Sequence, residues 1–161
     1  MPMYAKVTGM DDLIKKMQKL PEKAAKIAAE ALYEGAGVVA DAVTKETKGI
    51  KTKHFIKAQG GFKRTASPEE KEILVNANHG VSKFRYDGNS INTSIGFQNS
   101  GYAELGGKTV PIPLIANSIN SGTSFMQKQP FLRKAFSQSK SKALKTIESG
   151  IKAHENEFNL D

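Results

Sequence analysis

The sequence predicts an α+β fold: a small antiparallel sheet with a β-hairpin, packed by two long helices, one N-terminal and one C-terminal, plus short helices. Two observations lead to this class. Residues 22–46 and 131–157 carry apolar side chains at helical spacing, and residues 81–97 form two strand-like runs around a tight turn. Because the 161 residues show no internal repeat or linker, we expect a single domain, residues 1–161.

The first elements are a short strand over residues 4–8 and a helix over residues 11–20, which ends at Pro21. The helix over residues 22–46 follows, and small apolar residues line one face of it: Ile27, Ala31, Gly35, Val38 and Ala42. A glycine inside a helix costs about 1 kcal/mol relative to alanine. Gly35 and Gly37 therefore indicate that another element packs close to this backbone.

Residues 45–64 are predicted to be a basic, flexible loop. The segment holds seven cations against the single anion Glu46, and glycines interrupt it at Gly49, Gly60 and Gly61. Like charges repel and few apolar residues hold the segment in place, so we expect it to be the most mobile part of the free protein. Residues 54–56 are a candidate brief strand or anchor within it.

The next helix begins with a clear signature. Ser67 is the N-cap, Pro68 is the first helical residue, and Glu70 completes a capping box, so the helix is predicted to run to about His79 and to end at Gly80. Residues 81–86 and 91–97 then flank Asp87-Gly88-Asn89, and they are predicted to pair as a β-hairpin.

Two helices complete the chain. A short one is predicted over about residues 113–121 and ends at Gly122. The last begins at Pro130 or Phe131 and continues to about Glu157. Its apolar stripe consists of Leu132, Phe136, Ala143, Ile147, Ile151, His154 and Phe158.

Several kinds of chemistry are not expected. The chain has no cysteine, and its three histidines are scattered without ligand spacing, so we expect no metal and no cofactor. Residues 101–109 superficially resemble a phosphate-binding loop. That motif needs a glycine where Tyr102 stands and a helix that starts at Lys108, which Val110-Pro111 does not allow. We therefore expect no nucleotide binding and no enzymatic activity.

The net charge of +8 favours acidic partners, which include nucleic acid. The 24 basic residues are almost all lysine, however, and arginine is the usual reader of base edges. We therefore interpret the positive charge first as a lysine-rich surface exposed to solvent. The alternative is that the chain is a small basic DNA-binding protein. No apolar run is long enough for a membrane span, and the first residues lack a signal peptide. We expect a protein made in the cytoplasm, with no membrane partner.

Three short motifs carry a resemblance: Tyr102-Ala103-Glu104, the stretch 122–126 and the stretch 129–135. Together with the opening at residues 7–13, they resemble the tail-completion family of long-tailed bacteriophages, also called head–tail joining or neck morphogenesis proteins. Residues 49–80 match this family least, and residues 106–120 depart from its shortest form.

The same motifs have a structural interpretation. Gly122 is able to end a helix in a left-handed conformation, and Thr123 is able to accept hydrogen bonds in the turn. Pro130 fixes the start of the last helix, and Phe131 anchors it in the core. For Tyr102 and Glu104, which follow the hairpin, contact with a partner and a structural role remain equally open.

The resemblance implies a non-enzymatic structural virion protein at the head–tail connection of a tailed phage or prophage, made in the bacterial host. It implies contact with neighbouring neck and tail proteins and self-association into a ring, commonly of six copies; nonspecific contact with DNA is a further candidate. The basic loop is then an assembly segment. The candidate partner-binding residues are Lys48, Lys51, Lys53, Lys57, Lys63, Arg64, Tyr102 and Glu104.

Overall fold

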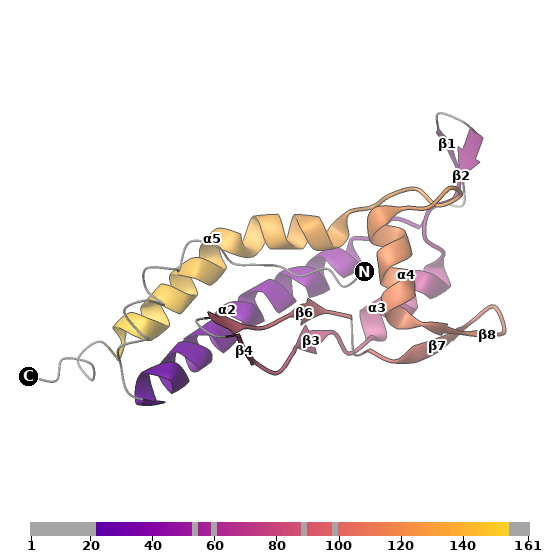
Figure 1. Ribbon diagram of the computed structural model, residues 1–161. Coiled ribbons are helices and arrows are strands. Elements are labelled where there is room, and N and C mark those ends of the chain that lie inside the picture. The colour runs from indigo at the N-terminus through magenta and orange to yellow at the C-terminus, as the bar shows by residue number, and fades with distance from the viewer. Residues whose placement is uncertain (1–21, 53–54, 59–60, 88–89, 98–99, 155–161) are drawn as a thin grey trace, which may run out of the picture. The chain divides into compact units, whose positions relative to one another are not determined.

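The computed structural model describes residues 22–52, 55–58, 61–87, 90–97 and 100–154. The strand expected at 4–8, the helix expected at 11–20 and the side chain of Phe158 lie outside this part. The described helices are α2 (Glu22–Lys48), α3 (Pro68–Asn76), α4 (Ile112–Ser121) and α5 (Phe131–Lys152). Two long helices with small hairpin sheets confirm the α+β class (Figure 1).

The strands form four two-stranded sheets in the described residues instead of one small sheet. They are β1 (Ile56–Ala58) with β2 (Gly61–Lys63), β3 (Gly80–Val81) with β6 (Ile95–Gly96), β4 (Arg85–Asp87) with β5 (Ser90–Asn92), and β7 (Tyr102–Leu105) with β8 (Lys108–Pro111). Short strands of this kind need helices or other chains for stability, because a lone hairpin is marginal in water.

The chain divides into two compact units. Unit one comprises residues 1–40, 81–95 and 139–161, and unit two comprises residues 41–80 and 96–138. Helices α2 and α5 contribute residues to both units. That all 161 residues behave as one domain stays a prediction.

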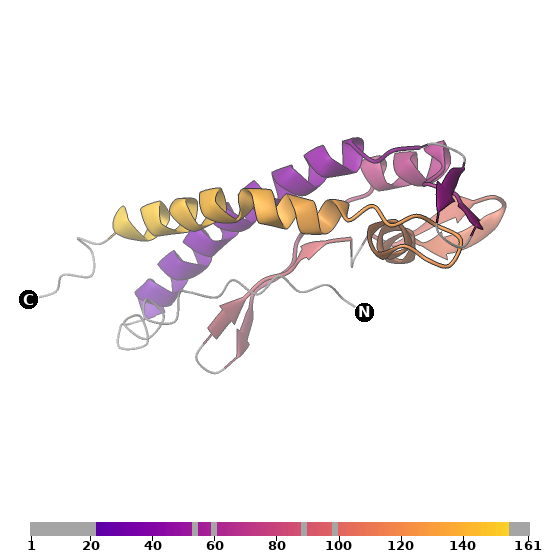
Figure 2. The ribbon, with the colours of Figure 1, turned by 90° about the horizontal axis from the view of Figure 1, so that it is seen from above.

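In unit one, α2 and α5 pack with very little space between their backbones (Figures 1 and 2). A Cβ atom on Gly35 would lie 2.7 Å from Ile147 Cδ1 and 3.1 Å from the carbonyl oxygen of Ala143. A Cβ atom on Gly150 would lie 3.0 Å from Ala31 Cβ. The close packing expected at Gly35 is confirmed. It is not found at Gly37, where a Cβ would meet nothing within 4 Å.

The hairpin of unit one is also confirmed, with shorter strands than expected. Strands β4 and β5 pair antiparallel, with Asp87 opposite Ser90. Each expected strand, 81–86 and 91–97, is split into two short strands. Between these short strands, side-chain hydroxyl groups take the place of backbone groups in the hydrogen bonds that join the two chains of the hairpin. Ser94 N donates to Ser82 Oγ (2.9 Å), and Thr93 Oγ1 donates to the Ser82 carbonyl oxygen (2.9 Å).

In unit two, α3 begins as predicted and ends earlier. The capping box is complete, since Glu70 N donates to Ser67 Oγ at 3.0 Å and Ser67 N donates to Glu70 Oε2 at 2.7 Å. The expected end at His79 is wrong: the helix stops at Asn76, and Ala77 is extended. Asparagine and histidine are weak helix formers, and the His79 ring instead lies 2.7 Å from Thr44 Oγ1.

Helix α4 ends at Gly122 as predicted. Gly122 has φ 76°, and a Cβ atom there would lie 2.9 Å from Lys128 N, so both conformation and space require glycine. Helix α5 begins at Phe131 but ends at Lys152, five residues before the expected end at Glu157. Its last turn tightens, because His154 N donates to the Ile151 carbonyl oxygen.

Candidate functional site

The expectation of a loop over residues 45–64 is wrong in two places: residues 45–48 still belong to α2, and residues 56–63 contain a hairpin. Strands β1 and β2 pair antiparallel, with Ile56 opposite Lys63 and Lys57 opposite Phe62. We call β1, β2 and the flanking residues Phe55 and Arg64 the basic hairpin; residues 59–60 lie outside the described part. Figure 1 shows its strands projecting away from α3 and α4. The brief strand expected at 54–56 begins only at Ile56.

The two faces of the basic hairpin differ. Lys63 Nζ donates to the carbonyl oxygen of Thr123 at 3.2 Å, so the face that bears Lys63 is tied to the loop before α5. Because side chains alternate along a strand, Lys57 and its cross-strand neighbour Phe62 belong to the opposite face. Both are exposed, and Phe62 shows 74% of its surface to solvent.

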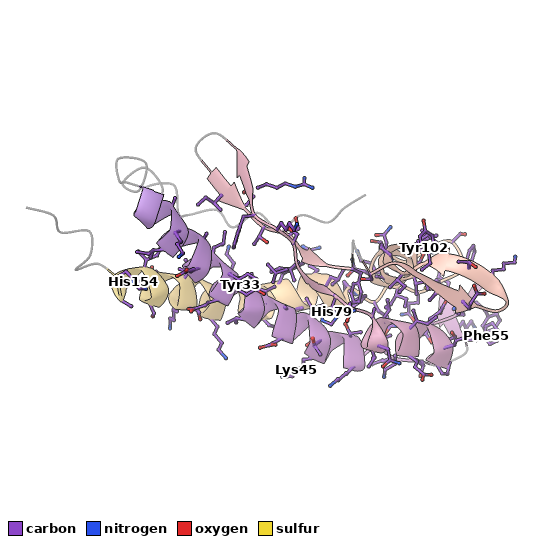
Figure 3. The ribbon with its side chains drawn as sticks, turned by 90° about the horizontal axis from the view of Figure 1, so that it is seen from below. Tyr33, Lys45, Phe55, His79, Tyr102 and His154 are labelled. Carbon is purple, nitrogen blue, oxygen red and sulfur yellow. The ribbon has the colours of Figure 1, made fainter. Side chains whose placement is uncertain are left out.

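Phe55 directly precedes β1 and stands two residues before Lys57, so continued alternation would put it on the same face. It is 73% exposed and is labelled in Figure 3. We call Phe55, Lys57 and Phe62 the aromatic face. Solvent exposure of two phenylalanine rings beside a lysine is the main chemical feature of this segment, and sequence reasoning singled out only its cations.

Arg64 anchors the base of the basic hairpin. Its guanidinium donates from Nη1 to Glu70 Oε2 and from Nη2 to Glu70 Oε1, both at 2.7 Å. Its backbone N donates to the Phe125 carbonyl oxygen, and its own carbonyl oxygen accepts from Gln127 N. The structure therefore gives this predicted partner-binding residue an intramolecular partner.

The ion pair also shifts the protonation of Glu70. Burial of the Glu70 side chain disfavours its charged form, but the hydrogen bonds from Arg64 and Ser67 and the charge of Arg64 outweigh burial. The pKa of Glu70 therefore lies below its ordinary value. The hydrogen bond to Glu70 raises the pKa of Arg64 in turn, against the effect of burial. The Glu70 carboxylate is therefore ionised in the folded protein at neutral pH.

Of the remaining predicted lysines, Lys48 and Lys51 lie at and just after the end of α2. Lys48 is the last residue of that helix and is exposed, and Lys53 lies outside the described residues. The backbone of Lys51 pairs with the side-chain amide of Gln129, with Lys51 N to Oε1 at 2.8 Å and Nε2 to the Lys51 carbonyl oxygen at 2.9 Å. The segment is therefore attached at Lys51 and at Arg64, and its overall mobility stays a prediction.

Tyr102 and Glu104 lie on a hairpin that the sequence analysis did not predict. Strands β7 and β8 are joined by Gly106 and Gly107, with φ 57° and 74°. Positive φ at both central residues matches a two-residue type I′ turn. Strand-like runs on both sides of Gly106-Gly107 are the sequence pattern that predicts such a hairpin. No helix begins at Lys108, so the phosphate-loop interpretation is excluded there.

On this second hairpin, Tyr102 and Glu104 share a face, because side chains alternate along a strand, and both are exposed. Tyr102 is labelled in Figure 3. Glu104 Oε1 accepts a hydrogen bond from Thr109 Oγ1 at 2.5 Å. Among the described residues, we observe no hydrogen bond, ion pair or ring contact between the side chains of Tyr102 and Glu104 and the basic hairpin. Whether they bind a partner therefore stays open.

Gly122, Thr123, Pro130 and Phe131 build the corner between α4 and α5. Thr123 Oγ1 accepts from Met126 N at 2.9 Å, as expected for a turn. Phe131 is only 5% exposed and packs edge-on to Phe97, with ring centroids 6.2 Å apart. These contacts are structural. Asn120, which sequence reasoning missed, completes the corner: its Oδ1 accepts from Leu132 N.

No three histidine, aspartate or glutamate side chains among the described residues gather closely enough to hold a metal ion. None of the helices in this part of the chain is long and apolar enough to cross a membrane.

The fold and site together are those of an α+β protein that presents exposed hairpins on anchored bases. Residues 11–103, more than half of the chain, match the family described as "Bacteriophage HK97-gp10, putative tail-component". The chain belongs to this HK97-gp10-like family of bacteriophage tail components. No curated protein and no solved structure matches it.

The family match confirms the resemblance to phage tail and neck proteins at the level of a phage tail component. It runs through residues 49–80, the stretch where the resemblance was weakest, and stops before the corner at Gly122 and Phe131. It supports a structural role in the virion.

Proposed function

We propose that the protein is a non-enzymatic component of the head–tail connection of a tailed phage or prophage, where it takes part in tail completion or neck assembly. Membership of a tail-component family supports this proposal. The observation that carries it is the aromatic face, where Phe55 and Phe62 are 73% and 74% exposed. Two large apolar side chains exposed on one short segment indicate a surface that another molecule covers.

In this proposal the protein acts only by binding its neighbours, without a chemical reaction. Burying one phenylalanine side chain stabilises a complex by about 1.5–3 kcal/mol before the costs of association. The anchors at Lys51 and Arg64 hold the base of the basic hairpin, so fewer residues need to be ordered when a partner binds. Exposed lysines at Lys48, Lys51 and Lys57 attract acidic surfaces and speed the encounter.

The partners are neighbouring neck and tail proteins together with further copies of this chain, assembled as a ring of six on the particle. The virion's head–tail interface is then the site of action. The remaining candidate residues, Tyr102 and Glu104, offer a second exposed surface for the same neighbours.

DNA binding is the second candidate function, and one observation favours it. Lys57 lies directly across the ladder from Phe62, which places a cation beside an exposed ring. Proteins that bind nucleic acid combine such cations for phosphates with rings on which bases stack. Binding of DNA that falls steeply with added salt would support this alternative.

Complementation of a phage that lacks this gene tests the proposal. We expect the double variant Phe55→Ala, Phe62→Ala to remain folded and to give full heads and complete tails that do not join. Leu114→Ala is the matched control, because Leu114 is a large exposed apolar residue on α4, outside the basic hairpin. Normal yields of joined particles from the double variant would contradict the proposal.

A further inference from the structure

Unit one contains an open groove that the family assignment leaves without a role. Its volume is about 580 Å³, and residues of α2 line it together with Phe84, which precedes β4. The residues that line the groove include Ala25, Ala29, Glu30, Tyr33, Glu34 and Phe84. Tyr33 packs edge-on to Phe84, with ring centroids 6.4 Å apart, and is still 58% exposed. Tyr33 is labelled in Figure 3.

The chemistry of the groove selects its occupant. Alanine methyl groups and two aromatic rings make it largely apolar, and Glu30 and Glu34 are both exposed at its side. Lys26 is the one cation among the described lining residues. A ligand that presents an aromatic ring next to a positive charge would satisfy both parts of this surface.

We propose that the groove binds the aromatic face of the basic hairpin of a second copy of this chain. This proposal rests on the self-association in the proposed function and names the surfaces that carry it. Phe62 adds a third ring to Tyr33 and Phe84, and Lys57 lies against Glu30 and Glu34. The pairing is complementary in charge and in apolar character, and the groove has room for a phenylalanine ring with a lysine stem beside it.

Such a contact is directional, because the hairpin of one copy meets the groove of the next. An open row of copies then has one unused hairpin at one end and one unused groove at the other until the set closes. A contact between two different surfaces generates a ring when its rotation closes. The groove and the basic hairpin are therefore two halves of one interface.

Cross-linking tests the contact directly, since the chain has no cysteine of its own. We mix the full-length variants Tyr33→Cys and Phe62→Cys, each with a different tag, and oxidise them with copper phenanthroline. We expect a disulfide-linked dimer that carries both tags. Leu114→Cys replaces Tyr33→Cys in the control mixture, because Leu114 is 54% exposed and is not a groove residue. Equal cross-linking in both mixtures would overturn the proposal.

The other occupant to be tested is the chain's own segment at residues 11–20, whose sequence carries Leu13, Ile14 and Met17. The double variant Met17→Cys, Tyr33→Cys separates the two. A fast-migrating cross-linked monomer, without any mixed dimer from the first experiment, would overturn the proposal in favour of this segment. A mixed dimer at a yield well above the Leu114→Cys control supports the second copy.

Charge exchange gives an independent readout that does not depend on cysteine. Sedimentation of Glu30→Lys, Glu34→Lys should show self-association weakened by about tenfold, the scale of a disrupted interfacial charge pair. Adding Lys57→Glu should restore much of the loss. Failure of this rescue, with both proteins folded, would count against the pairing. If the groove contact fails in both tests while the Phe55→Ala, Phe62→Ala phage still cannot join heads to tails, the proposed function stands and only this interface is wrong.

Discussion

Arg64 holds Glu70 by two hydrogen bonds of 2.7 Å, and the same Glu70 carboxylate caps the first turn of α3 through Ser67 N. One buried carboxylate therefore serves the base of the basic hairpin and the start of a helix together. The hairpin that carries the exposed aromatic face is thus attached to α3 by a bidentate ion pair.

Replacing Glu70 should loosen both attachments. We expect Glu70→Gln to lower the free energy of unfolding by about 1–3 kcal/mol, because it removes hydrogen bonds to a charged group while Arg64 stays partly exposed to solvent. Urea denaturation measures the change. Glu69→Gln is the control, since Glu69 is exposed in the same turn, and an equal effect of both variants would contradict the assignment.

The same carboxylate predicts a pH dependence. The folded pKa of Glu70 lies below its unfolded value, which is about 4.3 for a free glutamate. Its stabilising contribution is therefore fully present above that value and is lost as the pH falls through the folded pKa. We expect the difference in unfolding free energy between wild type and Glu70→Gln to shrink as the pH is lowered from 7 towards 3. A constant difference over this range would be inconsistent with the ion pair.

The two glycines of α2 should respond in opposite directions. Gly35→Ala places a methyl group against Ile147 and the backbone oxygen of Ala143, so we expect a loss of about 1–3 kcal/mol from overpacking, reduced by the better helix propensity of alanine. Gly37→Ala meets nothing within 4 Å and should stabilise the protein by up to about 1 kcal/mol. Thermal unfolding of both variants is the measurement, and stabilisation by Gly35→Ala would show that α5 does not pack there.

Asn120 should matter more than its helix neighbour Asn117. Asn120→Ala leaves Leu132 N without its acceptor at the start of α5, and we expect a loss of about 1 kcal/mol, as for a helix cap. Asn117→Ala removes only an exposed contact with Ser121 and should change little. Chemical denaturation compares them, and similar stabilities would rule out the capping role.

Hydrogen exchange tests the mobility of residues 45–64 in the free protein. We expect slow exchange in α5 and in α2, which includes residues 45–48, and faster exchange through most of residues 49–64. The exceptions are the amides of Gly49, Ile50, Lys51 and Arg64, which donate to acceptors in α2, Gln129 and Phe125. Strong protection from residue 49 to residue 64 would contradict the prediction. Reversal of Lys48, Lys51, Lys57 and Lys63 to glutamate should then abolish head–tail joining with the fold retained.

Local features of this protein were determined by the sequence itself. The capping box at Ser67 and Glu70, the pairing of β4 with β5 and the end of α4 at Gly122 were all predicted, because the atoms that decide them lie within a few residues of one another. The long helices were predicted from periodicity, and the need for a small residue at Gly35 followed from its cost in a helix. The hairpin at Gly106-Gly107 is equally local, although its Gly-Gly signal was not recognised in the sequence.

Only the tertiary structure decided what the basic residues do. The sequence analysis placed Arg64 and Lys57 in one set of cations, but Glu70 neutralises the first while the second stands beside an exposed ring. Asn120 and Leu132 are likewise joined across twelve positions. The energy of a charge or a buried amide depends on which partner lies within about 3 Å, and for residues far apart in the chain that distance is set by packing, which no local pattern of residues encodes.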